Sequence, residues 1–181
     1  KNLTALEYST CMMISGNKYD RFPQFNKSIK TRYCFTHGWA TWKRAWSVYS
    51  YRLSTPNFDN IEAILKHNLS VLSRESDWMD IVCKVRNGDT ISFWDYQWQL
   101  SVWANNGWSL QPPKNLTTNI GFDEFGTHTK KGDWRATIKA VETLNKIKPG
   151  YIEVGRLHDF IISLYITSLP GYIFRKFKIK I

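Results

Sequence analysis

The chain has 181 residues, of which 43% are apolar, and this is enough material for one domain with a buried core. Its formal charge of +10 at pH 7 indicates an anionic partner: a sugar nucleotide, an acidic membrane surface or nucleic acid. No apolar run is long enough to cross a bilayer as a simple helix, and three scattered cysteines argue against a disulfide framework and favour a reducing compartment.

The first predicted element is a short buried strand at residues 11–14, closed by the turn-forming Ser15-Gly16-Asn17. Residues 18–36 predict a loop and an irregular strand. A helix is then predicted from residue 41 to about residue 51, because apolar side chains recur there at helical spacing. Trp42 and Trp46 lie on that apolar stripe and are interpreted as core residues.

Two helices are predicted to follow. Asp59 is expected to cap the first, which runs to about residue 73 and buries apolar side chains along one face. The second is expected to start at Ser76 or Asp77 and to stop at the Asn87-Gly88 pair, since glycine commonly ends helices.

Asp95 is predicted to open a further helix, which ends at residues 105–107. Residues 108–111 alternate like a strand and stop at a Pro-Pro pair, and residues 114–132 predict an ordered loop. Asp133 is expected to cap a last helix, which the Pro-Gly pair at residues 149–150 closes.

Composition divides the chain into a domain at residues 1–155 and a tail at residues 156–181. The tail is apolar at first and then alternates basic with apolar side chains over residues 174–181. Such a segment either rests on anionic lipid at a membrane surface or is a solvated basic C-terminus.

Aromatic residues are frequent, with 9 Trp, 9 Tyr and 10 Phe, and they serve either as large core side chains or as faces that stack on sugar rings. Residues 37–46 read His-Gly-Trp-Ala-Thr-Trp-Lys-Arg-Ala-Trp, and residues 94–98 read Trp-Asp-Tyr-Gln-Trp. A later stretch carries Asn-Ile-Gly-Phe at residues 119–122, followed by Thr-His-Thr at residues 127–129.

In this order, these segments resemble the C-terminal, acceptor-side half of a bacterial GT-A-type glycosyltransferase, distantly similar to the Golgi N-acetylglucosaminyltransferase family. The resemblance covers about residues 9–155. It implies an α/β, partial GT-A fold, a mixed sheet flanked by helices without its N-terminal βαβ units. It also implies inverting transfer of a hexose or N-acetylhexosamine from a nucleoside-diphosphate sugar to a saccharide or glycolipid acceptor. The implied location is the cytoplasm, with peripheral contact at the inner face of the plasma membrane.

Asp95 is the catalytic residue that the resemblance implies. An inverting transfer needs a carboxylate that takes the proton from the attacking acceptor hydroxyl. Asp95 otherwise serves as a helix cap, and one carboxylate can do both. Trp94 and Tyr96, on either side of it, are expected to stack on acceptor sugars and to exclude water. Gly38 and Trp39 are expected at the turn that faces the donor–acceptor junction, with core packing as the alternative for Trp39.

The remaining implied site residues bind the donor. The turn at Asn119 and Gly121 leads to His128, which is expected to close over the donor diphosphate and to ligate a divalent Mn or Mg ion; the alternative is an exposed loop histidine. The Asp-x-Asp motif that holds this metal in the family is missing from the chain and is expected shortly before Lys1, so the chain is interpreted as a fragment.

Two other functions remain open. A non-catalytic carbohydrate-binding module would use the same tryptophans without a base. A nucleic-acid binder is the weakest alternative, because the basic residues are spread along the chain, and no nucleic-acid partner is expected. Cys34 and His37 have a spacing that suits zinc, but no second pair supports a metal site.

Overall fold

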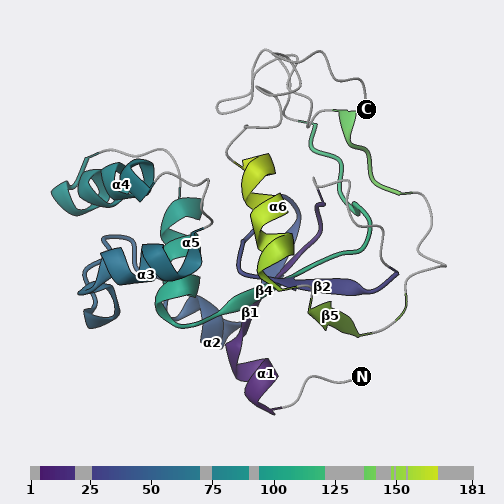
Figure 1. Ribbon diagram of the computed structural model, residues 1–181, viewed down its shortest axis with the longest axis horizontal. Helices are drawn as coiled ribbons and strands as arrows, with labels where there is room; N and C mark the ends of the chain where they lie inside the picture. Colours follow the sequence, from purple (N-terminus) through teal and green to yellow (C-terminus); the bar gives the residue numbers. More distant parts are fainter. Residues whose placement is uncertain are drawn as a thin grey trace.

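The structure is a computed structural model that describes residues 5–18, 26–69, 75–89, 94–120, 137–141, 148, 150–153 and 155–166. It has an α/β fold in which helices flank an open, mixed sheet of five strands (Figure 1). This confirms the predicted class at that level. The elements in chain order are α1 Ala5–Thr10, β1 Cys11–Ser15, β2 Ser28–Thr31, β3 Trp39–Thr41, α2 Lys43–Trp46, the 3₁₀ turn η1 Pro56–Phe58, α3 Ile61–Asn68, α4 Glu75–Asn87, α5 Asp95–Ala104, β4 Trp108–Gln111, β5 Tyr151–Glu153 and α6 Arg156–Ile166.

The strand order in the sheet is β3-β1-β4-β2-β5. Strands β1 and β4 are parallel, with Ile14 opposite Leu110, whereas β3 runs antiparallel to β1 and β2 antiparallel to β4. Because β1 and β4 are parallel, the loops that follow them leave the sheet at the same edge. In α/β sheets, ligands commonly bind at this carboxyl edge.

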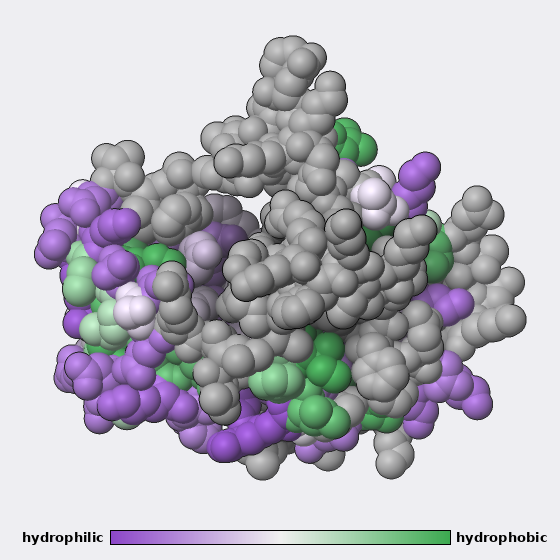
Figure 2. Space-filling model, turned by 45° about the horizontal axis from the view of Figure 1, so that its top comes forward, coloured by the Kyte–Doolittle hydropathy of each residue, from purple (hydrophilic) through white to green (hydrophobic). Residues whose placement is uncertain are grey.

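Helix α5 joins the sheet to the helical part of the molecule. On one side, Trp98 and Val102 pack with Met12 and Met13 of β1, and the Trp98 ring nitrogen lies 3.3 Å from the Met13 sulfur. On its other side, Trp103 belongs to a second apolar cluster that includes side chains of α3, α4 and α6. Helices α3 and α4 lie on the left in Figure 1, and their solvent side is largely hydrophilic in Figure 2.

Several predicted elements are confirmed with only small shifts at their ends. Strand β1 is buried along most of its length and is followed by the predicted turn. Helix α5 begins at Asp95 and ends before Gly107, and β4 occupies the predicted residues Trp108–Gln111.

The predicted helix at residues 41–51 is wrong in its extent, because only Lys43–Trp46 are helical. After Trp46 the backbone forms turns. The Ser50 N–H donates to the Ser101 hydroxyl of α5 at 3.2 Å and not to a helical backbone carbonyl. The core interpretation of Trp46 is also wrong, since this side chain is 40% exposed; the short helix buries Ala45 instead.

The predicted cap of the next helix is wrong by one residue. The Asn60 side chain, not that of Asp59, caps α3 by accepting the Ala63 N–H at 3.2 Å. Asp59 already has helical backbone angles, because it closes the 3₁₀ turn that starts at Pro56. This extra turn moves the start of the helix along the chain, a shift that the polar residue pattern alone does not reveal.

The helix predicted from Asp133 is not present where the structure describes that region. Residues 138–141 have no helical conformation. The Ala140 N–H donates to the Thr118 hydroxyl and the Val141 N–H to the Asn115 carbonyl, so partners in the loop after β4 replace helical ones. Asp133 itself lies outside the described residues.

The segment predicted as a tail begins with α6, Arg156–Ile166. His158 and Ile162 are buried, and Ile162 joins the core cluster of the α3, α4 and α5 helices. Residues 167–181, including the basic stretch, lie outside the described part of the chain. Within the described part, no helix has the length and apolar character needed to cross a membrane.

Candidate functional site

Two of the sequence-predicted segments meet at the carboxyl edge of β1 and β4. Trp39 is the first residue of β3 and lies opposite Ser15, the last residue of β1. Helix α5 leads directly into β4 and packs along β1, so its first residue, Asp95, lies at this edge of the sheet. Segments that are far apart in the sequence therefore contribute to one surface.

The aromatic rings of these segments are in direct contact. Trp39 stacks on Trp94, with ring centroids 5.2 Å apart and planes 29° apart. It also contacts Trp46 at 5.8 Å and the fully buried Trp98 at 6.0 Å. Trp94 and Trp46 are 39% and 40% exposed, so they form the outer layer of this cluster while Trp39 and Trp98 support it from behind.

Asp95 combines a local structural role with access to solvent. It is half-buried, and its Oδ1 accepts the backbone N–H of Tyr96 at 3.1 Å in the first turn of α5. The alternative role as a helix cap is wrong, because Trp94 holds the N-cap position and no side chain caps this helix. Its charge also reaches Tyr49: burial, then the neighbouring Tyr51 and Asp95, raise the pKa of the Tyr49 phenol. The carboxylate is therefore close to the aromatic surface and is not sealed in the core.

Gly38 brings a second loop to the same edge. Its φ of +60° lies in the left-handed region, and a Cβ at this position would lie closer than 3.0 Å to the Thr117 methyl. The Gly16 N–H donates to the Gly38 carbonyl at 2.6 Å, and the Gly16 carbonyl accepts the Leu116 N–H at 2.8 Å. The loops after β1 and β4 and the turn before β3 are thus tightly fitted, with Gly38 at their centre.

Polar side chains fix the loop that leads to Asn119. Asn115, which is buried, accepts the Lys18 N–H at 2.9 Å, and the Thr117 hydroxyl donates to the His37 carbonyl at 3.4 Å. Asn119 follows at the end of this loop and is half-exposed. These contacts fix the loop up to Thr117, two residues before the predicted turn residue Asn119.

Of the remaining predicted residues, the structure describes Tyr96, which it places away from this surface. The Tyr96 ring packs edge-on against Trp78 of α4, with centroids 5.2 Å apart, on a different side of α5 from the tryptophan cluster. Gly121 and His128 lie outside the described residues, and so does the predicted metal ligation by His128.

The sequence interpretation missed two residues of the surface. Trp46 was assigned to the core, and Tyr49 received no functional role, but their rings are stacked in parallel with centroids 4.6 Å apart and planes 4° apart. Their helical spacing in the sequence was the available signal, although Tyr49 lies in the turn that follows α2.

The metal sites considered from the sequence find no support in the described residues. No group of three or more His, Cys, Asp and Glu side chains there is close enough to hold an ion. Burial raises the pKa of the Cys34 thiol, with a further contribution from Cys11, so Cys34 is a poor thiolate ligand. The divalent metal implied by the resemblance thus has no donor set among these residues.

A second candidate lies at the opposite, amino edge of β1 and β4. It is a cavity of about 400 Å³ whose charged lining side chains are Lys30, Arg32, Glu153, Arg156 and Asp159. Lys30 pairs with Glu153 at 2.6 Å and lies over the Trp108 ring at 4.9 Å. The volume of this cavity suits a small ligand.

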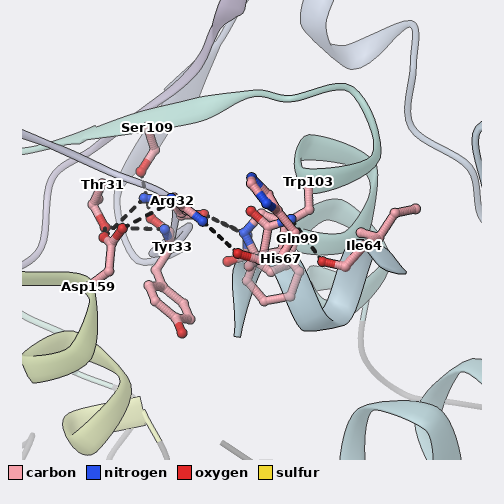
Figure 3. Close-up of polar contacts among 10 residues, drawn as sticks. Thr31, Arg32, Tyr33, Ile64, His67, Gln99, Trp103, Ser109 and Asp159 are labelled. Atoms are coloured by element: carbon pink, nitrogen blue, oxygen red, sulfur yellow. Dashed lines mark hydrogen bonds and ion pairs between the residues drawn. The ribbon is translucent and has the colours of Figure 1, made fainter. Parts of the chain in front are cut away.

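Arg32 and Asp159, two charged residues of this cavity, already hold elements of the fold together (Figure 3). Asp159 of α6 accepts the Thr31 hydroxyl at 2.7 Å and lies 3.6 Å from the Arg32 guanidinium, which in turn donates to the His67 carbonyl of α3 at 2.7 Å. Two side chains of α5 donate to the Arg32 carbonyl: Gln99 and Trp103. This network joins α3, α5 and α6 to β2, so we favour the carboxyl edge as the functional site.

Comparison of the chain with protein-family models, with curated proteins and with solved structures found no significant match.

Proposed function

We propose that this chain is the acceptor-side half of a GT-A-type glycosyltransferase, which moves a hexose or N-acetylhexosamine from a nucleoside-diphosphate sugar to a saccharide or glycolipid acceptor. The observation that carries the proposal is the stacking of Trp39 on Trp94 at 5.2 Å, directly beside Asp95. It joins two of the three segments on which the resemblance rests and adds a carboxylate to an exposed aromatic surface.

The chemistry assigned to Asp95 needs only an accessible carboxylate oxygen. As the acceptor hydroxyl attacks the anomeric carbon, its proton passes to Asp95, the new glycosidic bond forms on the opposite face, and the bond to the diphosphate breaks. Trp94 offers a flat apolar face to the acceptor ring and excludes water from the reacting hydroxyl. Inversion at the anomeric carbon follows from this single displacement.

Donor binding is assigned to the loop that follows β4. Asn119 follows β4, and Gly121 and His128 come after it in the sequence, outside the described residues. A divalent Mn or Mg ion would neutralise the departing diphosphate, and we propose that its ligands lie outside the described residues, His128 among them. None of the steps assigned to Asp95 and Trp94 passes through it.

The proposed place of action is the cytoplasmic face of the plasma membrane. The excess of positive charge, +10 for the chain, favours contact with anionic lipid headgroups and with anionic sugar nucleotides. We propose the basic residues 174–181 as the peripheral contact.

Asp95→Asn tests the proposal, because asparagine keeps the size of aspartate and an oxygen that can accept the Tyr96 N–H but does not take up the proton. The complete natural protein is incubated with a panel of sugar nucleotides, saccharide acceptors and manganese or magnesium, and transfer is followed by mass spectrometry. We expect turnover to fall about 100-fold or more while donor affinity is kept. Unchanged turnover in the variant would remove the assigned base.

Asp80→Asn is the matched control. Asp80 is an exposed carboxylate on α4, away from the tryptophan cluster, so its loss should leave turnover unchanged. Equal losses in both variants would indicate an effect of net charge and not of a base.

The second candidate function is a non-catalytic carbohydrate-binding module. The exposed Trp46 and Trp94 favour it, because stacking on sugars needs no carboxylate. If no sugar nucleotide in the panel is turned over while saccharides bind, the module is the better description.

A further inference from the structure

The exposed aromatic surface extends well beyond the residue next to Asp95. We call Trp94, Trp46 and Tyr49 the aromatic row. Trp94 and Trp46 meet edge-on with centroids 6.2 Å apart, and Trp46 stacks in parallel on Tyr49 at 4.6 Å. The row therefore begins at the residue before Asp95 and runs over α2 to the turn after it.

This exposure is unlike that of core tryptophans in the same chain. Trp98 and Trp103 are 0% and 2% exposed, whereas the two tryptophans of the row are each about two-fifths exposed. Contiguous exposed aromatic surface is disfavoured in water and commonly marks a binding site. The row is therefore a candidate binding surface in its own right.

The row is held rigidly from behind. Trp39 contacts both of its tryptophans, and Trp98 contacts Trp46 at 5.1 Å while its own ring nitrogen lies 3.3 Å from the Met13 sulfur in the sheet. A surface that is ordered before binding loses little conformational entropy when a ligand stacks on it.

Polar groups border the row. Lys43, the first residue of α2, and Ser47, which directly follows the helix, are both exposed, and the Tyr49 phenol is part of the row itself. An apolar stripe with hydroxyl and ammonium groups along it suits a ligand that has flat C–H faces and hydroxyl edges. Sugar rings have both features, and successive rings of an oligosaccharide repeat them.

We propose that the aromatic row binds the acceptor as a chain of at least two sugar units, with the reacting unit on Trp94 beside Asp95 and the preceding unit against the exposed parts of Trp46 and Tyr49. This inference rests on the proposed function and narrows its substrate class to oligosaccharides or the ends of polysaccharides. A single sugar would contact only the first part of the row.

The test is the dependence of binding on acceptor length. Neutral chito- and cello-oligosaccharides and acidic hyaluronan fragments, each from the shortest unit to the tetramer, are titrated into the complete natural protein and followed by tryptophan fluorescence and calorimetry. One further stacked ring adds up to about 1.5 kcal/mol, so affinity should rise up to about tenfold from the single unit to the dimer in at least one series. No length preference in any series overturns the proposal.

Variants assign the effect to the row. Trp46→Ala should abolish the gain with length while leaving the affinity for single units, whereas Trp94→Ala should weaken binding of every length. Tyr49→Ala repeats the test at a residue that is only partly buried. Chemical denaturation checks that each variant folds. Tyr8→Ala is the matched control, since Tyr8 is 43% exposed but contacts Trp42 and Arg44 instead of the row. An unchanged length preference in both Trp46→Ala and Tyr49→Ala contradicts the proposal.

The outcomes separate this inference from the proposed function. If Asp95→Asn abolishes turnover but Trp46→Ala does not change the dependence of binding on acceptor length, the proposed glycosyltransferase function is supported and the aromatic row is not an acceptor site. If Asp95→Asn leaves turnover unchanged while the length preference depends on Trp46, the aromatic row is supported as a saccharide-binding surface, and Asp95 is not the catalytic base. Self-association that Trp46→Ala abolishes, seen by analytical ultracentrifugation without any saccharide binding, would assign the row to protein contact and overturn the proposal.

Discussion

The tight fit between Gly38 and Thr117 makes a quantitative prediction about how the site is assembled. In Gly38→Ala, the new Cβ meets the Thr117 methyl closer than 3.0 Å, and the backbone keeps a φ of +60°. A non-glycine residue in the left-handed region costs about 1–2 kcal/mol, and forcing a methyl into a filled space costs about 1–3 kcal/mol. We therefore expect Gly38→Ala to lower the free energy of unfolding by about 2–5 kcal/mol.

Thr117→Ser separates these two contributions. It removes the methyl that the new Cβ would meet but keeps the hydroxyl that donates to the His37 carbonyl. Alone it should cost about 1 kcal/mol, because it deletes one packed methyl. Combined with Gly38→Ala it should restore about 1–3 kcal/mol, since the closest contact is then gone and the remaining one, to the Cβ of residue 117, is 3.2 Å. Urea denaturation of the four proteins, followed by tryptophan fluorescence, measures this coupling, and effects that add to within about 0.5 kcal/mol would refute the contact.

Two further predictions concern stability. Asn60→Ala should lower the free energy of unfolding by about 1 kcal/mol in urea denaturation, because Asn60 caps α3, whereas Asp59→Ala should change it little; equal losses would contradict the cap. Burial raises the pKa of Asp159 against the opposing hydrogen bonds from Thr31 and Arg32, so its contribution to stability is full below about pH 4 and is lost as pH rises through the folded pKa. Asp159→Asn should therefore remove a fall in stability over that window, and identical pH profiles of the urea midpoint for the two proteins would contradict this.

Local sequence patterns correctly predicted the elements whose ends coincide with turn-forming or helix-breaking residues. The run at β1 is apolar on successive residues and stops at a turn, and β4 stops at a Pro-Pro pair. Helix α5 begins at Asp95, which is the acidic residue of its first turn and stands at the start of an apolar stretch. Where burial and turn chemistry agree in this way, sequence alone suffices.

The failures occur where a distant partner replaces a local one. The helix expected through residue 51 ends early because Ser50 bonds to Ser101 of α5, and residues 138–141 are not helical because they bond to the loop at Asn115. Periodicity cannot anticipate such partners, since each belongs to a segment far away in the sequence. Tertiary contacts override helical spacing at these places.

The same reasoning explains why only part of the site was predictable. The sheet register places Trp39, next to Gly38, opposite the end of β1, and α5 packs on the same strand. The start of α5, with Trp94 and Asp95, therefore lies beside Trp39. The orientation of Tyr96 and the exposure of Trp46 depend instead on which side chains pack against each ring. Tyr96 packs against Trp78 of α4, away from the edge, and Trp46 stays 40% exposed. Spacing predicts which residues share a face but not what covers that face.

Helix α5 determines where the proposed base stands. It is fixed to β1 through Trp98, whose ring is 0% exposed, and to the end of β2 through Gln99 and Trp103, which both donate to the Arg32 carbonyl. These anchors lie one to two turns after Asp95 and do not involve its carboxylate, whose own bond is to the next backbone N–H. The carboxylate is thus positioned by contacts that Asp95→Asn leaves intact. A loss of turnover in that variant consequently reports on proton transfer and not on a displaced helix.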